Sequence, residues 1–344
     1  MKFDKEKYLN KRENIRQTNA FRGKLVNTKA TISEKAISGI ALSVIGNSIL
    51  AEIELNNKNV LVNCSVSGKI SSPNKNSTLI AVGDSIKIVL SQNSNNEKFI
   101  GRVVAVEERN TKLSRYAVGK KNFEHVIASN FDYLMIVVST FQPNYNKRFI
   151  DRLIIASEIG GIKPIIVINK IDLTEDLAFF FDDLKIYKEL EIPIFYISSL
   201  AGNGIDEIKE FTKNKISLFF GPSGVGKSTL INLLLGEYTQ EIREISERTN
   251  KGQHTTSFVK MLKTNFGAKI IDSPGVREFA LWDIDKQNLA LHFHDFDKYR
   301  QNCKYYACTY IHEPDCAVIQ AVEDGQIDIE RYQSYLNIFD TLEE

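Results

Sequence analysis

The sequence of 344 residues lacks long apolar runs and any excess of charge of one sign. No stretch approaches the roughly 20 apolar residues that a membrane-spanning helix needs, so we expect no membrane partner. The N-terminus is charged and has no apolar signal core, which predicts a cytoplasmic protein. The net charge is +1, and this excludes a strong overall field for nucleic acid or membrane.

Cysteines are also few, but three of the four are clustered. Cys64 stands alone and is interpreted as a small buried residue. In a reducing compartment, clustered thiols favour a metal over a disulfide. The spacing Cys303-x4-Cys308-x7-Cys316, with His312 between the last two, is typical of a structural Cys₃His zinc site with one ion per chain. The alternative is three structural cysteines without a metal.

The remaining sequence divides into four parts by pattern and charge. Residues 1–36 hold ten Lys or Arg against four acids. We interpret 1–35 as a basic arm, which is either solvated or ordered on RNA phosphates. The next predicted part is 36–110, followed by 111–280 and 281–344. The last part contains the cysteine cluster and then a helix near its end.

Residues 36–110 show five or so short strands with turns between them and no helix-length periodic segment. This pattern predicts a small β-barrel. An OB-fold is the main candidate, because its exposed face binds oligonucleotides. An SH3-like barrel has a similar pattern. Residues 111–280 instead alternate apolar strands with helices, which predicts a parallel sheet covered on both faces. The expected fold class is therefore multidomain α/β.

A glycine-rich segment carries the strongest motif. It matches G-x-x-x-x-G-K-[ST] between an apolar strand at 217–220 and an apolar helix at 230–235, as a phosphate loop requires. Its glycines let backbone N–H groups turn toward phosphates. Lys227 is predicted to reach the β- and γ-phosphates, and Ser228 to ligate Mg²⁺. The segment consists of Gly221, Pro222, Ser223, Gly224, Val225, Gly226, Lys227, Ser228 and Thr229.

A second motif, N-K-x-D, directly follows the apolar strand 165–168 and predicts guanine selection. The Asp172 carboxylate can accept from both N1–H and N2–H₂ of guanine, a pairing that adenine does not offer. Asn169 would brace this loop, and the stem of Lys170 would cover the base. The motif consists of Asn169, Lys170, Ile171 and Asp172, and Ser198 and Ser199 fit the loop that closes over the base.

A D-x-x-G element follows the strand 269–271. Asp272 is predicted to hold Mg²⁺ through water, and the N–H of Gly275 to sense the γ-phosphate. Thr255 and Thr256 lie between the phosphate loop and this element. Either threonine fits as a second Mg²⁺ ligand in the triphosphate state, and Thr256 is the assigned one.

The order of these motifs along the chain is unusual, because the base motif precedes the phosphate loop. Ordinary GTPases place the base motif last, so the order predicts a circularly permuted P-loop GTPase domain. Since 281–344 follows the D-x-x-G element, that segment is expected to read out the nucleotide state.

The residue that would orient the attacking water is not in its ordinary place. Many GTPases carry a glutamine just after D-x-x-G, but Val276 stands here and cannot orient water. Slow intrinsic turnover is expected. His254 lies just before the threonines and is the candidate for this task; the alternative is a solvated loop histidine.

These residues together resemble the RsgA (YjeQ/YloQ) family of ribosome-assembly GTPases over nearly the whole chain. Beyond the nucleotide motifs, the resemblance is carried by short segments spread along the sequence. They are Val82–Asp84, Arg109, Leu113–Arg115, Ala128–Asp132, Asp151–Arg152, Gly275–Phe279, Glu313–Val318 and Ile329–Tyr335.

The resemblance implies an OB-fold, a permuted GTPase domain and a C-terminal α-helical zinc-binding domain. It also implies that the small (30S) ribosomal subunit stimulates GTP hydrolysis to GDP and phosphate late in its maturation, with rRNA bound. We expect a monomer. The hydrolytic histidine of the family falls on His254. One departure concerns zinc, because the family places a histidine where this chain has Tyr310, and His312 is expected to replace it.

Two other function classes compete with this interpretation. One is an RNA-binding scaffold whose nucleotide site only stabilises the fold, against which the intact Lys227, Ser228 and Asp272 argue. The other is a small-molecule kinase or ATPase that uses the same phosphate loop, against which Asn169–Asp172 argues.

Overall fold

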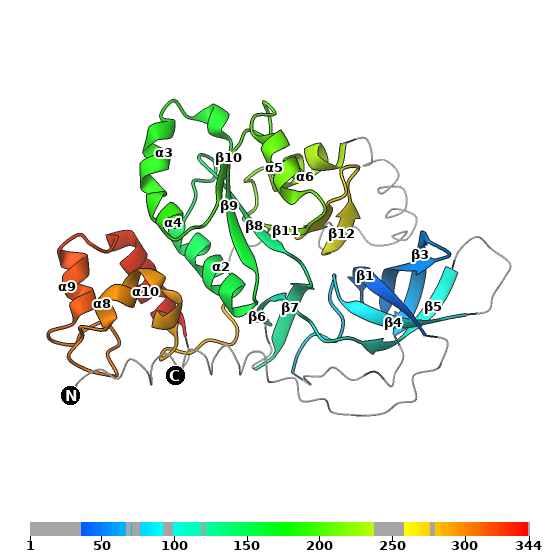
Figure 1. The fold of residues 1–344 in the computed structure, drawn as a ribbon, viewed down its shortest axis with the longest axis horizontal. Helices are drawn as coiled ribbons and strands as arrows, with labels where there is room; N and C mark the ends of the chain where they lie inside the picture. The colour runs from blue at the N-terminus through cyan, green and yellow to red at the C-terminus, as the bar shows by residue number, and fades with distance from the viewer. Residues whose placement is uncertain are drawn as a thin grey trace. The chain divides into compact units, whose positions relative to one another are not determined.

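The computed structural model describes residues 36–66, 70, 76–91, 99–117, 119, 122–236, 258–275 and 279–342. These residues form two compact units, which are drawn in Figure 1. The larger unit carries a barrel and an α/β sheet and extends to Asp283. The smaller unit begins at Ile284 and is helical.

The barrel consists of five strands, with a long connection before β4 and another before β5. They are β1 (Ile37–Ile45), β2 (Ser48–Leu55), β3 (Lys58–Val66), β4 (Ser85–Leu90) and β5 (Phe99–Val106). The order β1-β2-β3-β5-β4 closes through the pairing of β4 with β1, and only β3 and β5 pair in parallel. A closed five-stranded barrel with this crossover is an OB-fold, so this candidate is confirmed over the SH3-like alternative.

The barrel interior follows the predicted alternation. Ile49, Ala51 and Ile53 of β2 are buried, and the β2–β3 turn places Asn56 and Asn57 at positive φ. Two asparagines with positive φ are typical of a tight hairpin turn. Cys64 lies in this core, and burial raises the pKa of its thiol to about 11. Its predicted role as a small buried residue is confirmed.

A two-stranded hairpin, β6 (Lys112–Tyr116) with β7 (Glu124–Ser129), lies next to the barrel. The fully buried carboxylate of Asp84 accepts hydrogen bonds from Arg109 Nε at 2.7 Å, Arg109 Nη2 at 2.8 Å and Ser129 Oγ at 2.5 Å. At Gly83 the approach is so close that a Cβ atom would lie 1.9 Å from the carbonyl oxygen of Ser129. Three of the segments that carry the family resemblance, those with Asp84, Arg109 and Ser129, therefore contact one another.

The α/β part contains a six-stranded sheet of order β10-β9-β8-β11-β13-β12, in which β12 alone is antiparallel to its neighbour in the order. The chain runs from β8 outward to β10, and then from β11 in the other direction. The strand order therefore reverses between β8 and β11. The strands are β8 (Tyr133–Ser139), β9 (Lys163–Asn169), β10 (Ile194–Tyr196), β11 (Ile216–Phe220), β12 (Lys260–Lys263) and β13 (Lys269–Asp272).

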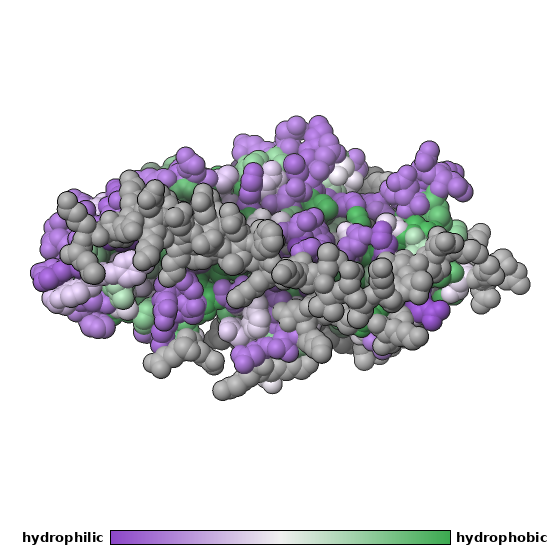
Figure 2. Space-filling model, turned by 60° about the horizontal axis from the view of Figure 1, so that its bottom comes forward, coloured by the Kyte–Doolittle hydropathy of each residue, from purple (hydrophilic) through white to green (hydrophobic). Residues whose placement is uncertain are grey.

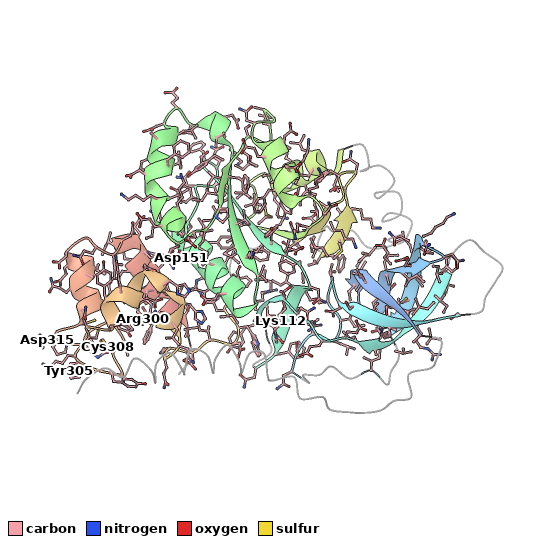
Figure 3. All side chains as sticks on the ribbon, in the orientation of Figure 1. Lys112, Asp151, Arg300, Tyr305, Cys308 and Asp315 are labelled. Carbon is pink, nitrogen blue, oxygen red and sulfur yellow. The ribbon has the colours of Figure 1, made fainter. Side chains whose placement is uncertain are left out.

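Helices cover both faces of this sheet (Figure 1). On one face, α5 and α6 pack on alternate residues of the strands, such as Met135, Val137 and Val167. On the other, α2 lies against β8 and β9, and its buried Asp151 accepts from Tyr187 Oη at 2.8 Å (Figure 3). The predicted two-sided covering is confirmed. The helices are α2 (Lys147–Ile159), α3 (Leu177–Asp183), α4 (Lys185–Glu189), α5 (Ile205–Thr212) and α6 (Lys227–Leu235).

The sheet and the barrel are continuous through β12, which pairs with β1 at Ser43 and Lys260. The carboxylate of Glu52 on β2 is nearly buried, and it forms ion pairs with Lys263 of β12 and, at 3.6 Å, with Lys269 of β13. The barrel therefore contacts the two strands that precede and carry Asp272.

The helical unit consists of short helices around an aromatic core. Phe293, Phe296 and Tyr335 lie within 5.3 Å of one another, measured between ring centroids. The predicted terminal helix is confirmed as α10. The helices are α8 (Asp297–Arg300), α9 (Ala317–Glu323) and α10 (Ile329–Thr341), with 3₁₀ turns at Leu289–His292 and His294–Phe296.

The surface shown in Figure 2 places hydrophobic residues in patches among hydrophilic ones, and the hydrophilic residues predominate in what is coloured. Within the described ranges, no helix is long and apolar enough to cross a membrane.

Candidate nucleotide site and cysteine cluster

The predicted nucleotide motifs meet at one edge of the sheet. The phosphate loop follows β11, the base motif begins with the last residue of β9, and the D-x-x-G element begins with the last residue of β13. These strands are parallel, so their carboxyl ends share one edge. Ligands of open α/β sheets bind beyond the carboxyl ends of the strands, where the strand order reverses. Here that place lies between β8 and β11.

The phosphate loop has the backbone that its glycines predict. Gly224 and Gly226 adopt φ values of 86° and 87°, a region that L side chains rarely enter. A Cβ atom at Gly226 would lie 2.3 Å from Nδ2 of Asn169. Helix α6 begins at Lys227, directly after this loop, and its N-terminus favours a phosphate anion.

Lys227 is the only lysine of the phosphate loop, and the residue is 7% exposed. Its ammonium donates to Asp272 Oδ1 at 2.9 Å and to the carbonyl of Ser273. Ser228 follows in the first turn of α6. Lys227 and the Asp272 carboxylate thus lie together at the phosphate loop, and Ser228 directly follows the lysine. Hydroxyl and carboxylate oxygens are ligands that suit Mg²⁺.

The base motif is fixed to the phosphate loop and to the serine loop. Asn169 Nδ2 donates to the carbonyl of Val225 at 2.8 Å, and its Oδ1 accepts from the N–H of Ser199 at 2.9 Å. Asp172 is exposed, and its Oδ1 accepts from Ser198 Oγ at 2.5 Å. The structure therefore brings the Asp172 carboxylate and both serines together with the phosphate loop.

The D-x-x-G element lies close to Ser223 of the phosphate loop. A Cβ atom at Gly275 would lie 3.0 Å from the backbone nitrogen of Ser223. The hydroxyl of Ser273 donates to the carbonyl of Phe219 at 2.9 Å and ties the element to β11. Gly275 is therefore close enough to the phosphate loop for its N–H to face a terminal phosphate.

The remaining predicted site residues, His254, Thr255 and Thr256, lie outside the described residues, as does Val276. Their predicted roles stay predictions. One contact was missed from the sequence: the hydroxyl of Thr140 donates to the carbonyl of Lys170 at 2.8 Å. The sequence feature that could have identified Thr140 is its place as a polar residue directly after the buried strand β8, at the same sheet edge.

In the helical unit, the three clustered cysteines come together as predicted; Figure 3 labels one of them, Cys308. Their sulfur atoms all lie within 4.8 Å, with Cys303 to Cys316 at 3.9 Å and Cys308 to Cys316 at 3.5 Å. Two thiolates on one tetrahedral zinc ion, each about 2.3 Å from it, would lie about 3.8 Å apart. The donor set and its spacing therefore fit zinc.

The three thiols differ in the direction in which their pKa values shift. The hydrogen bond between Cys303 and Cys316 raises the pKa of Cys303 and lowers the pKa of Cys316. Burial raises the pKa of Cys308 to about 11. His312 is exposed and, among the described residues, is not part of the group that the three sulfur atoms form. Its ligation stays a prediction.

Side chains that the sequence did not identify hold the cysteine loop. Tyr335 Oη donates to the carbonyl of Thr309 at 2.7 Å, and Tyr332 Oη donates to that of Tyr310 at 2.8 Å. The Glu313 carboxylate accepts from Thr309 N at 2.6 Å. Burial would raise the pKa of Glu313, but the hydrogen bonds from Thr309 prevail and lower it to about 2.

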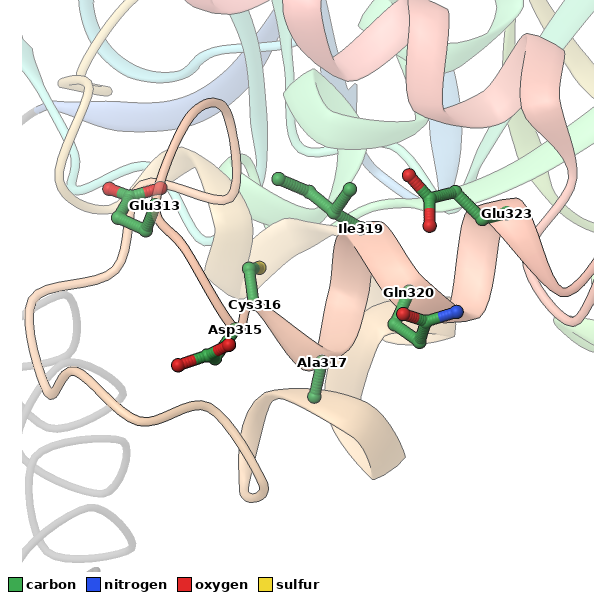
Figure 4. Close-up of a pocket in the computed structure, with 7 residues that line it drawn as sticks. All are labelled: Glu313, Asp315, Cys316, Ala317, Ile319, Gln320 and Glu323. Carbon is green, nitrogen blue, oxygen red and sulfur yellow. The ribbon is translucent and has the colours of Figure 1, made fainter.

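A cavity of about 400 Å³ lies beside Cys316 (Figure 4). Its lining includes the carboxylates of Glu313, Asp315 and Glu323. This acidic lining disfavours a phosphate group.

A parallel sheet that presents a phosphate loop, a guanine motif and a D-x-x-G element in this chain order defines a circularly permuted GTPase. The RsgA GTPase family model matches residues 106–282, and the chain belongs to this family. The protein is therefore a GTP-hydrolysing enzyme.

Two relatives align with most of this chain and with most of their own length. A "Small ribosomal subunit biogenesis GTPase RsgA" from Chlorobaculum parvum is 38% identical over 314 residues, which cover 90% of this chain and 99% of the relative. A protein of the same name from Flavobacterium psychrophilum is 37% identical over 281 residues, or 80% and 85% of the two chains.

Two crystal structures are similar as well. YjeQ from Thermotoga maritima has a TM-score of 0.62 and 29% identity, and the match covers 89% of this chain and 98% of YjeQ. YloQ, described as a circularly permuted GTPase, has a TM-score of 0.64 and 25% identity, covering 89% and 95%. The predicted family and fold class are confirmed.

Proposed function

We propose that this protein is a ribosome-stimulated GTPase that binds rRNA and acts in late maturation of the small ribosomal subunit. The convergence of Lys227, Asp272 and Asp172 on one sheet edge carries the enzymatic half of the proposal. The names of the relatives support the ribosomal half. Binding to the particle, rather than to a metabolite, agrees with an OB-fold barrel, a fold that binds oligonucleotides.

At the nucleotide site, each side chain has one task. Lys227 binds the β- and γ-phosphates, and Asp172 pairs with guanine N1 and N2. Ser228 and, through water, Asp272 would hold Mg²⁺, which would supply charge neutralisation at the phosphates. The N–H of Gly275 binds the γ-phosphate. Thr256, or Thr255 beside it, adds an oxygen ligand in the triphosphate state.

His254 orients the attacking water in this proposal, because Val276 has no group that could do so. An imidazole nitrogen within hydrogen-bond reach of water positions it in line with the γ-phosphate. The small subunit stimulates turnover at this step.

Outside the nucleotide site, we propose one structural zinc ion per chain, held by Cys303, Cys308, Cys316 and His312. The barrel is assigned to 36–110, the GTPase domain to 111–280 and the zinc domain to 281–344. The basic arm 1–35 contacts rRNA phosphates. The protein acts as a monomer in the cytoplasm.

Co-sedimentation with purified small subunits tests the ribosomal half of the proposal. Binding should be tighter with a non-hydrolysable GTP analogue than with GDP, because the γ-phosphate orders the residues around Gly275. By linkage, the subunit should tighten triphosphate binding by the same factor. Deleting residues 1–30 should flatten the salt dependence without changing intrinsic hydrolysis. Equal pelleting in both nucleotide states would contradict the proposal.

A further inference from the structure

A loop outside the phosphate loop, the N-K-x-D motif, the serine loop and the D-x-x-G element also lies at the nucleotide site. It comprises Ser139–Pro143, from the last residue of β8 into the first part of the connection to α2. Ser139, the last residue of β8, pairs with Asn169 in the parallel ladder between β8 and β9. The loop therefore begins at the same sheet edge, directly beside the first residue of the base motif.

Thr140 holds the main chain of the base motif at two places. Its N–H donates to the carbonyl of Asn169 at 3.1 Å, and its hydroxyl donates to the carbonyl of Lys170 at 2.8 Å. Thr140 is 5% exposed, so water does not compete freely for these bonds. Both carbonyls precede Asp172 by only a few bonds of backbone, so these bonds constrain the main chain that leads into Asp172.

Lys170 needs this support, because its backbone is left-handed, with φ 65° and ψ 34°. A residue with a Cβ atom is strained in that region by roughly 1–2 kcal/mol, and the surrounding contacts must impose it. Its ammonium donates back to the carbonyls of Phe141, at 3.3 Å, and Gln142. The loop and the lysine thus hold each other in place.

The same loop reaches the phosphate loop. Ser139 is fully buried, and its hydroxyl donates to the carbonyl of Pro143 at 2.6 Å, which fixes the turn. A Cβ atom added at Gly224 would lie 3.5 Å from Cδ of Pro143, so Pro143 lies close to the phosphate loop. The loop is therefore bonded to the base motif and lies beside the phosphate loop.

From this geometry we infer that Ser139–Pro143 is a further element of the nucleotide site, in which Thr140 is a positioning residue for guanine selection. Thr140 acts through Lys170 and Asn169 and does not itself pair with the base. The inference rests on the proposed guanine recognition by Asp172. Its consequence is specific: the Thr140 hydroxyl should contribute to the preference for guanine over adenine and little to phosphate binding.

The test compares Thr140→Val, which removes the hydroxyl at nearly constant volume, with Thr140→Ser, which keeps it. The measurements are the dissociation constants of the full-length protein for GDP and ADP with Mg²⁺, and the melting temperature. Thr212→Val is the matched control, because its buried hydroxyl donates to the carbonyl of Ile208, at 2.7 Å, within helix α5.

Thr140→Val should weaken GDP binding roughly tenfold, the scale of one lost buried hydrogen bond, and leave ADP binding within about twofold. The Ser variant and the Thr212→Val control should keep the wild-type ratio of GDP to ADP affinity. Equal losses for GDP and ADP, or no loss for GDP, would overturn the inference. A wild-type protein that does not prefer GDP to ADP would instead refute base recognition by Asp172, on which the inference rests.

Discussion

The nucleotide site and the cysteine cluster are both made of loops, but the two are held in place in different ways. The nucleotide loops follow buried strands of one sheet, so the ladder sets their positions. In the described part of the helical unit, from 284 to 342, there is no strand. Its cysteine loop is held instead by Tyr332, Tyr335 and Glu313 and by the sulfur atoms themselves.

This difference has a consequence for substitutions. A change in a nucleotide loop should alter binding or turnover while the sheet stays folded. A change among the cysteines should affect metal binding and folding together, because a metal that binds only the folded state adds its binding free energy to stability.

The largest effect is expected for Cys308→Ala, which should lose the zinc ion and the fold of the helical unit. Structural zinc contributes roughly 10–16 kcal/mol of apparent binding free energy in small domains. Elemental analysis and limited proteolysis would measure the loss. Cys64→Ala, a buried cysteine of the barrel, is the control and should keep one zinc per chain. Retention of zinc and of protease resistance in Cys308→Ala would contradict the expectation that metal binding and folding of the helical unit depend on each other.

The fourth ligand can be tested within the same unit. His312→Ala should weaken zinc binding, whereas Tyr310→Phe should not, because the Tyr310 ring packs on Phe296 and Tyr335. A competitive chelator titration measures both affinities. If His312→Ala keeps full affinity and Tyr310→Phe does not, the ligand assignment is wrong.

Asp172→Asn should weaken GTP binding by about 3 kcal/mol, since one acceptor becomes a donor that faces the donors of guanine. The same variant should favour xanthosine nucleotides, which present an acceptor at the 2-position. Its melting temperature should stay near that of the wild type, because Asp172 is exposed. Unchanged GTP affinity would show that Asp172 does not recognise guanine.

His254→Ala should lower subunit-stimulated turnover by roughly 10²-fold and leave GTP affinity nearly intact, the effect of losing a positioning group. Lys227→Ala is the contrasting variant and should damage binding itself. Single-turnover hydrolysis and equilibrium binding separate the two. A normal stimulated rate in His254→Ala would show that another group, such as one from rRNA, orients the attacking water.

The smallest effect is expected at Glu124 of β7, which is 1% exposed and contacts Lys112 of β6 and Ser77; we call these contacts the hairpin joint. Burial would raise its pKa, but hydrogen bonds from Lys112 and Ser77 prevail and hold it below the ordinary 4.5. The ionised form therefore stabilises the fold above pH 4.5, and this stabilisation is lost as the pH falls.

Glu124→Gln tests this joint. At pH 7 it should lower the free energy of unfolding by about 1–2 kcal/mol, and the difference from the wild type should shrink below pH 4.5. Denaturant unfolding at several pH values measures it. A constant difference across that range would show that the charge of Glu124 is not what stabilises the joint.

The sequence predicted that the nucleotide motifs lie together, and the described ones share one sheet edge for a physical reason. Each motif directly follows an apolar run that forms a buried strand, and parallel strands bring their carboxyl ends together whatever lies between them. The OB-fold was one of two candidates, because strand patterning alone does not determine the order β1-β2-β3-β5-β4. That order depends on pairings between distant segments.

Other features could not be predicted because they depend on contacts between segments far apart in the sequence. The pairing of β12 with β1 joins residues more than 200 positions apart, Ser43 and Lys260. Likewise, nothing local to Tyr335 indicates that its hydroxyl holds the carbonyl of Thr309. Thr140 was missed because its role requires Lys170 to adopt a left-handed backbone, which periodicity does not reveal.

The central claim is that the small subunit stimulates a GTPase that has no glutamine of its own for orienting water. The most direct measurement is GTP hydrolysis by the full-length protein with and without purified small subunits. We predict slow intrinsic turnover that rises many-fold when subunits are added, and a rise that is lost in His254→Ala. Equal turnover with and without subunits would contradict the claim and favour a scaffold whose nucleotide site only stabilises the fold.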